Sequence, residues 1–335
     1  MTASALSLSE LCGSSDRSLL LIHGRDFKPA EEFYMDLSLA AIRAGIERDY
    51  PDSVDAFDVM NKDVAWYGDL NAEILRARGK SYDESLDIGD RRIALSALRE
   101  INVRKKFGIR QYDQLPGKSA VPEAIVNIVA PILGALGFCI PMIRCVSKDF
   151  ARYLDTKADF AMRVRQRLRE RLCQLLDRGD RVVLMSHGTG SVVAYDVLWQ
   201  LSHDPDYKNR YSDKKVELWI TLGAPLGDAH IQKRLLGAKE KSAARFPLNV
   251  IAWHNLSAED DYTCHDNTLA DDFKKMMQQR VVSAVHDYRI FNLAVRYGRS
   301  NPHSSIGYFI HPRTTKILVD WLQTSPVEGA PKYTL

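Results

Sequence analysis

The stretch Arg181-Val-Val-Leu-Met-Ser-His-Gly-Thr-Gly-Ser-Val-Val-Ala-Tyr-Asp-Val-Leu-Trp199 decides the fold. It opens with an apolar run, Val182 to Met185, which is typical of a buried strand. The run stops at a cluster of small residues, and apolar residues at helical spacing follow from Val192 to Leu201. The pattern predicts a strand, a tight turn and a helix in immediate succession.

The turn resembles the nucleophile elbow of the α/β-hydrolase superfamily. In that family the residues two before and two after the nucleophile are small, because the elbow brings the strand and helix backbones together. Ser186 and Gly190 fit this rule, which places the nucleophile position at Gly188. Other registers fail, because Leu184 or Val193 would then stand at a crowded position. The resemblance therefore identifies Gly188 as the central residue of the elbow.

Glycine has no hydroxyl, so the frame of a serine hydrolase lacks its attacking atom. One hypothesis is a carboxylic-ester hydrolase of the lipase or esterase type that is inactive or strongly impaired because Gly188 replaces the nucleophile. The other is a non-catalytic pseudo-hydrolase that binds an apolar small molecule or a protein partner. Both hypotheses stay open at the level of the sequence.

A second part of the resemblance lies near the start of the chain. Residues 18–22 form an apolar run that predicts a buried strand, and it ends at His23-Gly24-Arg25-Asp26. A His-Gly pair after an early strand is similar to the oxyanion loop of the superfamily. The resemblance implies that the backbone N–H of Arg25, or of Asp26, and that of Thr189 would stabilise an oxyanion.

The remaining members of a catalytic triad are expected on two late loops. Asp261 stands six residues after Asn255, the spacing that lipase-like relatives show, and is preferred to Asp260. His303 lies on the loop between the last predicted strand and the closing helix, where the family keeps its general base. In that family the histidine takes the proton of the nucleophile and the acid fixes its tautomer. The presence of both residues favours the ester-hydrolase hypothesis over the pseudo-hydrolase.

The resemblance covers residues 18–323 and implies an α/β-hydrolase fold, with a mostly parallel central sheet flanked by helices and an inserted helical cap. Residues 1–17 are expected to form a lead-in, and residues 324–335 a flexible tail. Further strands are predicted at 54–60, 215–222, 249–255 and 288–295, and helices at 31–48, 148–178 and 314–322. Candidate substrate-lining residues are His23, Gly24, His187, Trp66 and Pro225.

The segment 70–147 is expected to be the cap or lid. Its part 91–110 holds seven basic residues against one acidic residue, and 124–143 has no charged residue. Two prolines and two glycines interrupt that apolar stretch, so a cap that faces the substrate, or a pair of buried helices, fits better than a membrane span. Residues 91–143 also predict peripheral contact with a membrane or lipid surface, although such a charge run is also typical of a solvated helix face.

Composition excludes several classes of function. A net charge of +3 gives no indication of a nucleic-acid partner. The pairs His265-Asp266 and His286-Asp287, with Cys264 nearby, fit no zinc signature, so neither a metal nor another cofactor is expected. Five cysteines at irregular spacing and the lack of a signal-peptide pattern predict free thiols and a cytoplasmic protein.

Overall fold

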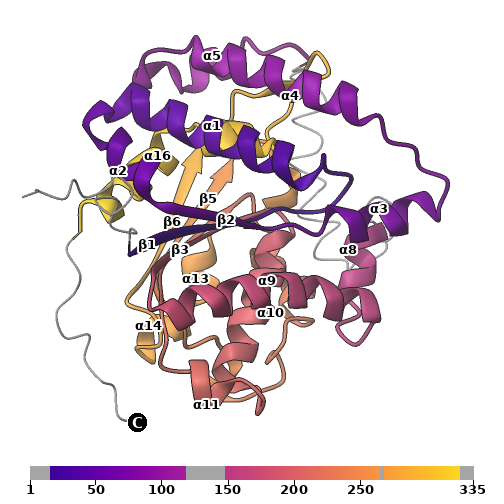
Figure 1. Cartoon of the computed structure of the whole chain (residues 1–335), viewed down its shortest axis with the longest axis vertical. Helices are drawn as coiled ribbons and strands as arrows, with labels where there is room; N and C mark the ends of the chain where they lie inside the picture. Colours follow the sequence, from indigo (N-terminus) through magenta and orange to yellow (C-terminus); the bar gives the residue numbers. More distant parts are fainter. Residues whose placement is uncertain (1–15, 118–147, 265–267, 325–335) are drawn as a thin grey trace, which may run out of the picture.

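The centre of the structure is a six-stranded sheet in which every pair of neighbouring strands is parallel. The computed structural model describes residues 16–117, 148–264 and 268–324. The strand order is β2-β1-β3-β4-β5-β6 (Figure 1). The strands are β1 (Arg17–Ile22), β2 (Asn61–Ala65), β3 (Arg181–His187), β4 (Val216–Leu222), β5 (Val250–Ala258) and β6 (Ala284–Ile290). A short antiparallel hairpin follows, formed by β7 (Val295–Arg296) and β8 (Arg299–Ser300).

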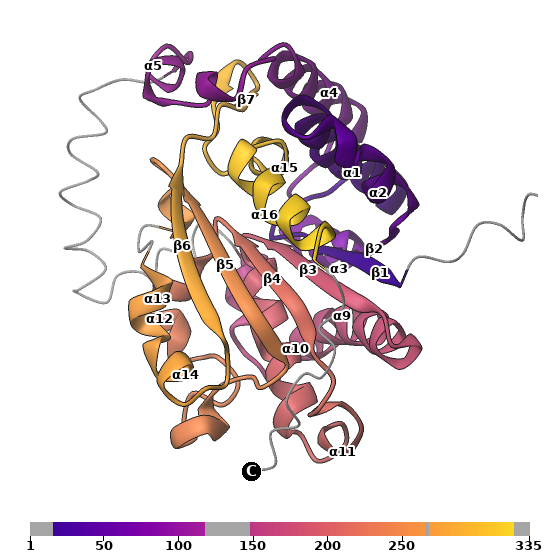
Figure 2. The same ribbon diagram turned by 90° about the vertical axis from the view of Figure 1, so that its left-hand side faces the viewer.

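Helices cover both faces of this sheet, which confirms the predicted α/β fold class (Figure 2). One face packs against α1 (Glu31–Asp49), α15 (Ser305–Phe309) and α16 (Pro312–Leu322), with α4 (Glu84–Arg99) outside α1. The other face packs against α8 (Lys148–Tyr153), α9 (Asp159–Arg178), α10 (Gly190–His203), α13 (Leu269–Asp272) and α14 (Lys274–Gln278). The remaining helices are α2 (Val54–Val59), α3 (Gly68–Arg76), α5 (Ile109–Tyr112), α11 (Lys208–Tyr211) and α12 (Ala229–Gln232).

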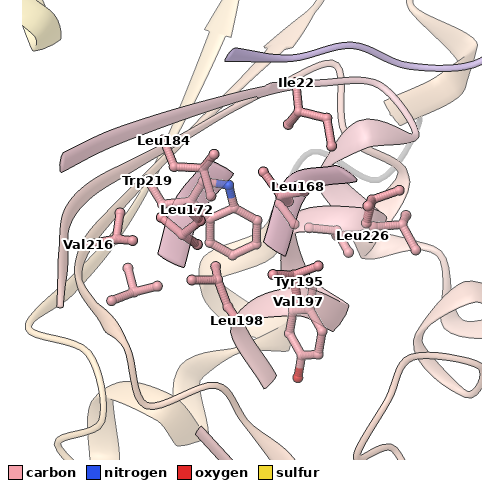
Figure 3. Packing of buried hydrophobic residues seen from close by; sticks show 14 of the residues in the cluster. Ile22, Leu168, Leu172, Leu184, Tyr195, Val197, Leu198, Val216, Trp219 and Leu226 are labelled. Carbon is pink, nitrogen blue, oxygen red and sulfur yellow. The ribbon is translucent and has the colours of Figure 1, made fainter. Parts of the chain in front are cut away.

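Alternate residues of the central strands enter opposite layers of the core. Leu19 and Leu21 of β1 belong to the cluster beneath α1, whereas Leu20 and Ile22 belong to the cluster beneath α9 and α10. A strand buried on both faces must be apolar at every position, which explains the continuous apolar runs. Figure 3 shows the cluster beneath α9 and α10, where Leu168 of α9 packs close to the sheet.

The prediction of a strand at 54–60 is wrong. Residues Val54–Val59 form α2, and the strand is β2, at Asn61–Ala65. Val54, Phe57 and Met60 lie three residues apart, and Phe57 and Met60 are buried, so the spacing is helical. β2 escapes prediction because it is an edge strand that carries Lys62 and Asp63, so its apolar pattern is short.

Two other predicted elements have different limits. The helix expected over 148–178 is divided into α8 and α9, and the guanidinium of Arg165 donates to Thr156 O at 2.6 Å across the break. The last strand, expected over 288–295, is β6 at Ala284–Ile290, and the chain then turns into the β7–β8 hairpin. The closing helix is α16, as predicted, and starts two residues earlier with Pro312.

Only part of the expected cap falls within the described residues. α4 packs on α1, α15 and β7 rather than on the elbow, and residues 118–147, which include the apolar stretch 124–143, lie outside the described residues. The cover of the elbow by that stretch therefore stays a prediction. None of the helices in the described residues combines the length and the apolar character that a membrane-spanning helix requires.

In the sheet, β1 lies between β2 and β3. The order in which the chain adds strands therefore reverses between β1 and β3: β2 is added on one side of β1, and the later strands are added on the other. In parallel α/β sheets such a switch point leaves a crevice at the carboxyl ends of the two strands. The loop after β1 and the turn after β3 meet there. A Cβ added at Gly190 would overlap His23 O and lie 2.9 Å from His23 C and 3.2 Å from Ile22 O.

This close approach gives a stability prediction. Gly190→Ala should lower the free energy of unfolding by about 3 kcal/mol, because the new methyl group meets backbone atoms that cannot move aside as a side chain could. The matched control is Gly89→Ala in α4, where an added Cβ has no neighbour within 4 Å and should stabilise by about 0.5–1 kcal/mol. Urea unfolding monitored by circular dichroism measures both. If the two substitutions changed the free energy of unfolding equally, the close approach of the backbones at Gly190 would be contradicted.

Candidate active site

Asp261 and His303 meet at the carboxyl edge of the sheet. Asp261 follows β5, and His303 lies in the loop between β8 and α15. His303 Nδ1 donates to Asp261 Oδ2 at 2.9 Å. The predicted contact between these two residues, 42 positions apart in the chain, is therefore confirmed.

The other edge of the His303 ring faces Gly188. Gly188 has φ of 56°, the left-handed conformation expected for the centre of the elbow. A Cβ built on it would lie 3.0 Å from His303 Nε2 and 3.1 Å from Cε1. Since Nδ1 is bonded to the acid, Nε2 is the nitrogen that a side chain at residue 188 would meet.

The surroundings of Asp261 keep its carboxylate ionised. Its Oδ2 also accepts from Tyr308 Oη at 2.7 Å, and its Oδ1 accepts from Thr263 N at 3.0 Å. Burial opposes the charged form, but the neighbouring His303 and these hydrogen bonds lower the pKa of Asp261 to about 2. Asp260, the alternative acid, instead accepts from Tyr112 Oη at 2.9 Å, so Asp261 is the one of the two that contacts His303.

Two residues that the sequence did not single out complete the acid's environment. Tyr308 Oη donates to Asp261 and accepts from Ala258 N at 2.9 Å, so it ties the acid to the end of β5. Gly223, at the end of β4, has φ of 59°, and a Cβ there would lie 2.7 Å from Asp261 Oδ2. Glycine is needed at 223 because any side chain would displace the carboxylate.

The loop that carries His303 is held by its backbone carbonyls. Asn292, a fully buried residue, donates through Nδ2 to Pro302 O at 2.8 Å and to Ser304 O at 2.9 Å. His187 donates through Nε2 to the carbonyl between them, His303 O, at 3.0 Å. Three consecutive carbonyls therefore have fixed donors, and the imidazole of His303 is positioned by its own backbone.

His187 supports the site rather than taking part in proton transfer. Its ring lies 4.6 Å from that of His303, centroid to centroid. Burial, and then the neighbouring His303, hold the pKa of His187 well below its usual range, so the ring stays neutral. A neutral ring with Nε2 as donor fits the bond to His303 O.

The hydroxyl of Ser186 is held by contacts inside the core. It is fully buried, its Oγ accepts from Trp219 Nε1 at 2.9 Å, and it lies 3.0 Å from Ser191 Oγ. Trp219 is among the labelled residues of Figure 3. The hydroxyls of Ser186 and Ser191 thus form structural contacts on either side of the turn after β3.

His23 fixes the start of the loop after β1. Its Nδ1 donates to Gly24 O at 2.8 Å, and its Nε2 accepts from Tyr67 N at 3.0 Å, so a single neutral tautomer satisfies both bonds. Burial holds the pKa of His23 well below its usual range. Tyr67 Oη in turn donates to His23 O at 2.6 Å and its ring stacks on the imidazole.

The next carbonyls of this loop also have side-chain donors. Asn71 Nδ2 lies 3.3 Å from Gly24 O and 3.2 Å from Asp26 O. Lys28 Nζ donates to Arg25 O and lies 3.3 Å from Asp26 O and 3.2 Å from Phe27 O. The carbonyl oxygens of residues 23 to 27 are thus all engaged, which fixes the orientation of the peptide planes between them.

The backbone N–H groups of the loop differ in their availability. Asp26, with φ of 69°, donates its N–H to Asp149 Oδ2 at 2.6 Å, so this amide is occupied. Within the described residues, neither Arg25 N nor Thr189 N has an acceptor. A Cβ on Gly24 would lie 3.3 Å from Thr189 N, which shows how closely the two turns approach. Of the two predicted alternatives, the geometry leaves Arg25 rather than Asp26 as the partner of Thr189.

A small cavity lies next to these two donors. Its lining comprises Arg25, Tyr67, Asn71, Asp149, Phe150, Tyr153, Phe160, Val164, Thr189 and Val193. Its volume of about 10 Å³ has room for a single water molecule. The cavity is too small for an acyl chain, so it is not by itself a substrate pocket.

The other expected lining residues lie in two places. Pro225 is buried at the start of η3 (Pro225–Gly227), which packs beside η5 (Tyr262–Cys264) and so lies near the acid. Trp66 donates to Pro29 O at 3.1 Å and lines a charged surface hollow with Arg167 and Arg171. The structure therefore brings Pro225 to the site and turns Trp66 toward α9.

No converging metal ligands are found among the described residues. His265 and Asp266 lie outside these residues. Asp287 accepts from Leu269 N at 3.2 Å and from Ala270 N at 2.8 Å, so its carboxylate holds the start of α13.

The chain has no significant match among protein-family models, curated proteins or solved structures.

The bond from Tyr308 to Asp261 predicts a pH-dependent stability. Tyr308→Phe should cost about 3 kcal/mol near neutral pH, because a charged acceptor loses its donor and Ala258 N loses its acceptor. The pKa of Asp261 is lowered from 3.8 to about 2, so the stability it contributes is present above 3.8 and is lost as the pH falls toward 2. The cost of Tyr308→Phe should shrink over the same interval.

Urea unfolding at a series of pH values measures this effect. Tyr195→Phe is the matched control, because Tyr195 Oη donates to a neutral carbonyl, Arg245 O, at 3.2 Å. Its cost of about 1 kcal/mol should not change with acidification. A cost of Tyr308→Phe that is equally independent of pH would contradict the ionised state of Asp261.

The bond from Asp26 to Asp149 predicts local protection of one amide. Asp149→Ala should accelerate hydrogen exchange of the Asp26 amide by about 10-fold or more, since a charge-assisted bond worth about 2 kcal/mol is lost. Glu84→Ala is the control, because Glu84 accepts from Ala30 N at 2.6 Å outside the loop. Glu84→Ala should accelerate hydrogen exchange of the Ala30 amide and leave that of the Asp26 amide unchanged. If the exchange rate of the Asp26 amide were the same with and without Asp149→Ala, other contacts would hold the loop.

Proposed function

We propose that this chain is an α/β-hydrolase-fold protein of the carboxylic-ester, lipase-like type, with Gly188 at the nucleophile position and therefore inactive or strongly impaired. The observation that carries the proposal is the line from Asp261 through His303 to residue 188. The acid bonds Nδ1 at 2.9 Å, and Nε2 lies 3.0 Å from the position of a Cβ on Gly188. Since neither residue is close to Gly188 in sequence, the arrangement is a property of the fold.

The surrounding groups support the same chemistry. An ionised Asp261 holds the proton of His303 on Nδ1 and stabilises the imidazolium that forms when Nε2 accepts a proton. The N–H groups of Arg25 and Thr189 are available to an oxyanion beside the elbow. Orientation of the histidine and stabilisation of an oxyanion therefore have residues assigned to them, whereas the covalent step has none.

Gly188 cannot form an acyl-enzyme. A water molecule in the space of the missing hydroxyl would be polarised by His303 Nε2 and would attack an ester carbonyl directly. Frames without their nucleophile keep about 10³–10⁴-fold acceleration over water, supplied by the oxyanion donors and by binding. The proposal thus includes slow hydrolysis of a small-molecule ester.

One observation favours the alternative, a pseudo-hydrolase that binds an apolar small molecule or a protein partner. A carbon 3.0 Å from His303 Nε2 is closer than ordinary contact, so the ring occupies part of the room that a serine side chain needs. A glycine relieves both this contact and the left-handed backbone. The site as it stands is therefore adapted to glycine.

Substitution of residue 188 separates the two functions. Gly188→Ser should restore turnover of a p-nitrophenyl ester of medium chain length to at least about 10³-fold above the glycine form, because His303 and the oxyanion donors already surround the new hydroxyl. The protein should also become labelled by a fluorophosphonate. His303 must shift by a few tenths of an ångström to make room for the serine side chain.

Gly188→Ala is the matched control, since it has the same backbone strain of about 1–3 kcal/mol without a hydroxyl. It should remain inert, and His303→Ala in the serine variant should abolish both signals. A serine variant as stable as the alanine variant, yet unlabelled and without turnover, would exclude the hydrolase and leave the binding protein.

A further inference from the structure

One surface segment, residues 92–110, concentrates positive charge on the outside of the molecule. It comprises the end of α4, η2 (Arg104–Lys106) and the start of α5. Its six basic residues are all exposed: Arg92, Arg99, Arg104, Lys105, Lys106 and Arg110. Arg91, the seventh basic residue of this region, is instead buried and bonds Asp87 Oδ2 at 2.8 Å. We refer to the six exposed residues as the basic surface.

The charges of the basic surface are not neutralised within the described residues. None of the six forms an ion pair there, although Arg104 lies over the Tyr50 ring. The exposed arginines of α9 behave differently, since Arg163 and Arg167 each reach a carboxylate, the latter at 2.8 Å. Glu100 is the sole acidic residue between positions 92 and 110. The basic surface is therefore free to attract an external polyanion.

Aliphatic side chains are exposed among these charges. Ile93 is 70% exposed, Ile109 57% and Val103 44%. Large aliphatic residues within a basic segment suit a bilayer surface, where the aliphatic groups enter the boundary with the acyl chains and the cations contact the headgroups. A nucleic acid would take the charges but gives no favourable environment to the aliphatic groups. The combination favours an anionic lipid surface.

The basic surface is connected to the candidate active site. Tyr112, at the end of α5, donates to Asp260 Oδ2 at 2.9 Å, next to the acid. Four residues later, Pro116 O accepts from Ser300 N at 2.7 Å, at the start of the loop that carries His303. Both views show α4 and α5 together at one end of the molecule (Figures 1 and 2). A bilayer bound there would lie beside the acid and histidine loops.

We propose that this protein docks on anionic lipid bilayers through the basic surface, with Ile93, Val103 and Ile109 as its apolar contacts. The proposal does not depend on catalysis, so it holds for a hydrolase and for a pseudo-hydrolase. Each basic residue close to an anionic bilayer should strengthen binding by about fivefold at moderate ionic strength.

Vesicle co-sedimentation of the full chain tests the proposal. The protein should bind phosphatidylcholine vesicles that contain phosphatidylserine, and bind vesicles of phosphatidylcholine alone much more weakly. The double change Lys105→Glu and Lys106→Glu should weaken binding to the anionic vesicles by at least about 25-fold. Ile109→Ser should weaken it at constant charge, which separates insertion from attraction.

The matched control is Lys274→Glu with Lys275→Glu, which makes the same change of charge at two exposed lysines of α14. Figure 1 shows α14 at the opposite end of the molecule from α5. The control should bind anionic vesicles within about twofold of the unmodified chain, since its charges lie far beyond the Debye length from the bilayer. Equal losses in the two double variants would overturn the proposal, as would equal binding to neutral vesicles. Tighter binding to a DNA duplex than to anionic vesicles would show that the partner of the basic surface is a nucleic acid and not a lipid bilayer.

Discussion

The contact between the loop after β1 and the turn after β3 is the constraint on which the site depends. Gly190 has no room for a Cβ because the His23 carbonyl lies against it, and a Cβ on Gly24 would lie 3.0 Å from His187 O and 3.3 Å from Thr189 N. Two backbones can approach this closely only where side chains are absent. This approach sets the distance between the two candidate oxyanion donors, and it fixes where α10 leaves the sheet.

A second principle of the site is that its loops are held by their carbonyl groups. Side chains donate to the carbonyls of residues 23 to 27, and to those of residues 302 to 304. A peptide plane whose oxygen is bonded has a fixed N–H direction as well. The loops are thus ordered before any ligand arrives, as electrostatic preorganisation requires.

The sequence was sufficient for the parts of the site that follow from local pattern. The elbow, Asp261 and His303 each stand at the end of a predicted strand or before a helix, and chain order places them at one edge of a parallel sheet. Asn292, Tyr308 and Asp149 were missed, because each acts on a residue that only the fold brings near. The spacing of apolar residues along the sequence does not predict which buried amide or phenol will bond a loop far away in the chain. The error at 54–60 is of another kind, since a short apolar run fits both a helix and a strand.

Residue 188 is subject to two local constraints. A left-handed backbone and a ring within 3.0 Å of the Cβ position both favour glycine, by an amount of about 1–3 kcal/mol for the backbone alone. A catalytic serine would have to overcome these costs, and the pinned loops limit how far His303 can retreat. The same bonds that preorganise the site therefore stabilise its glycine form. None of the hydrogen bonds that hold these loops comes from a side chain at residue 188, so Asp261, His303 and the loop after β1 keep their geometry with glycine at this position.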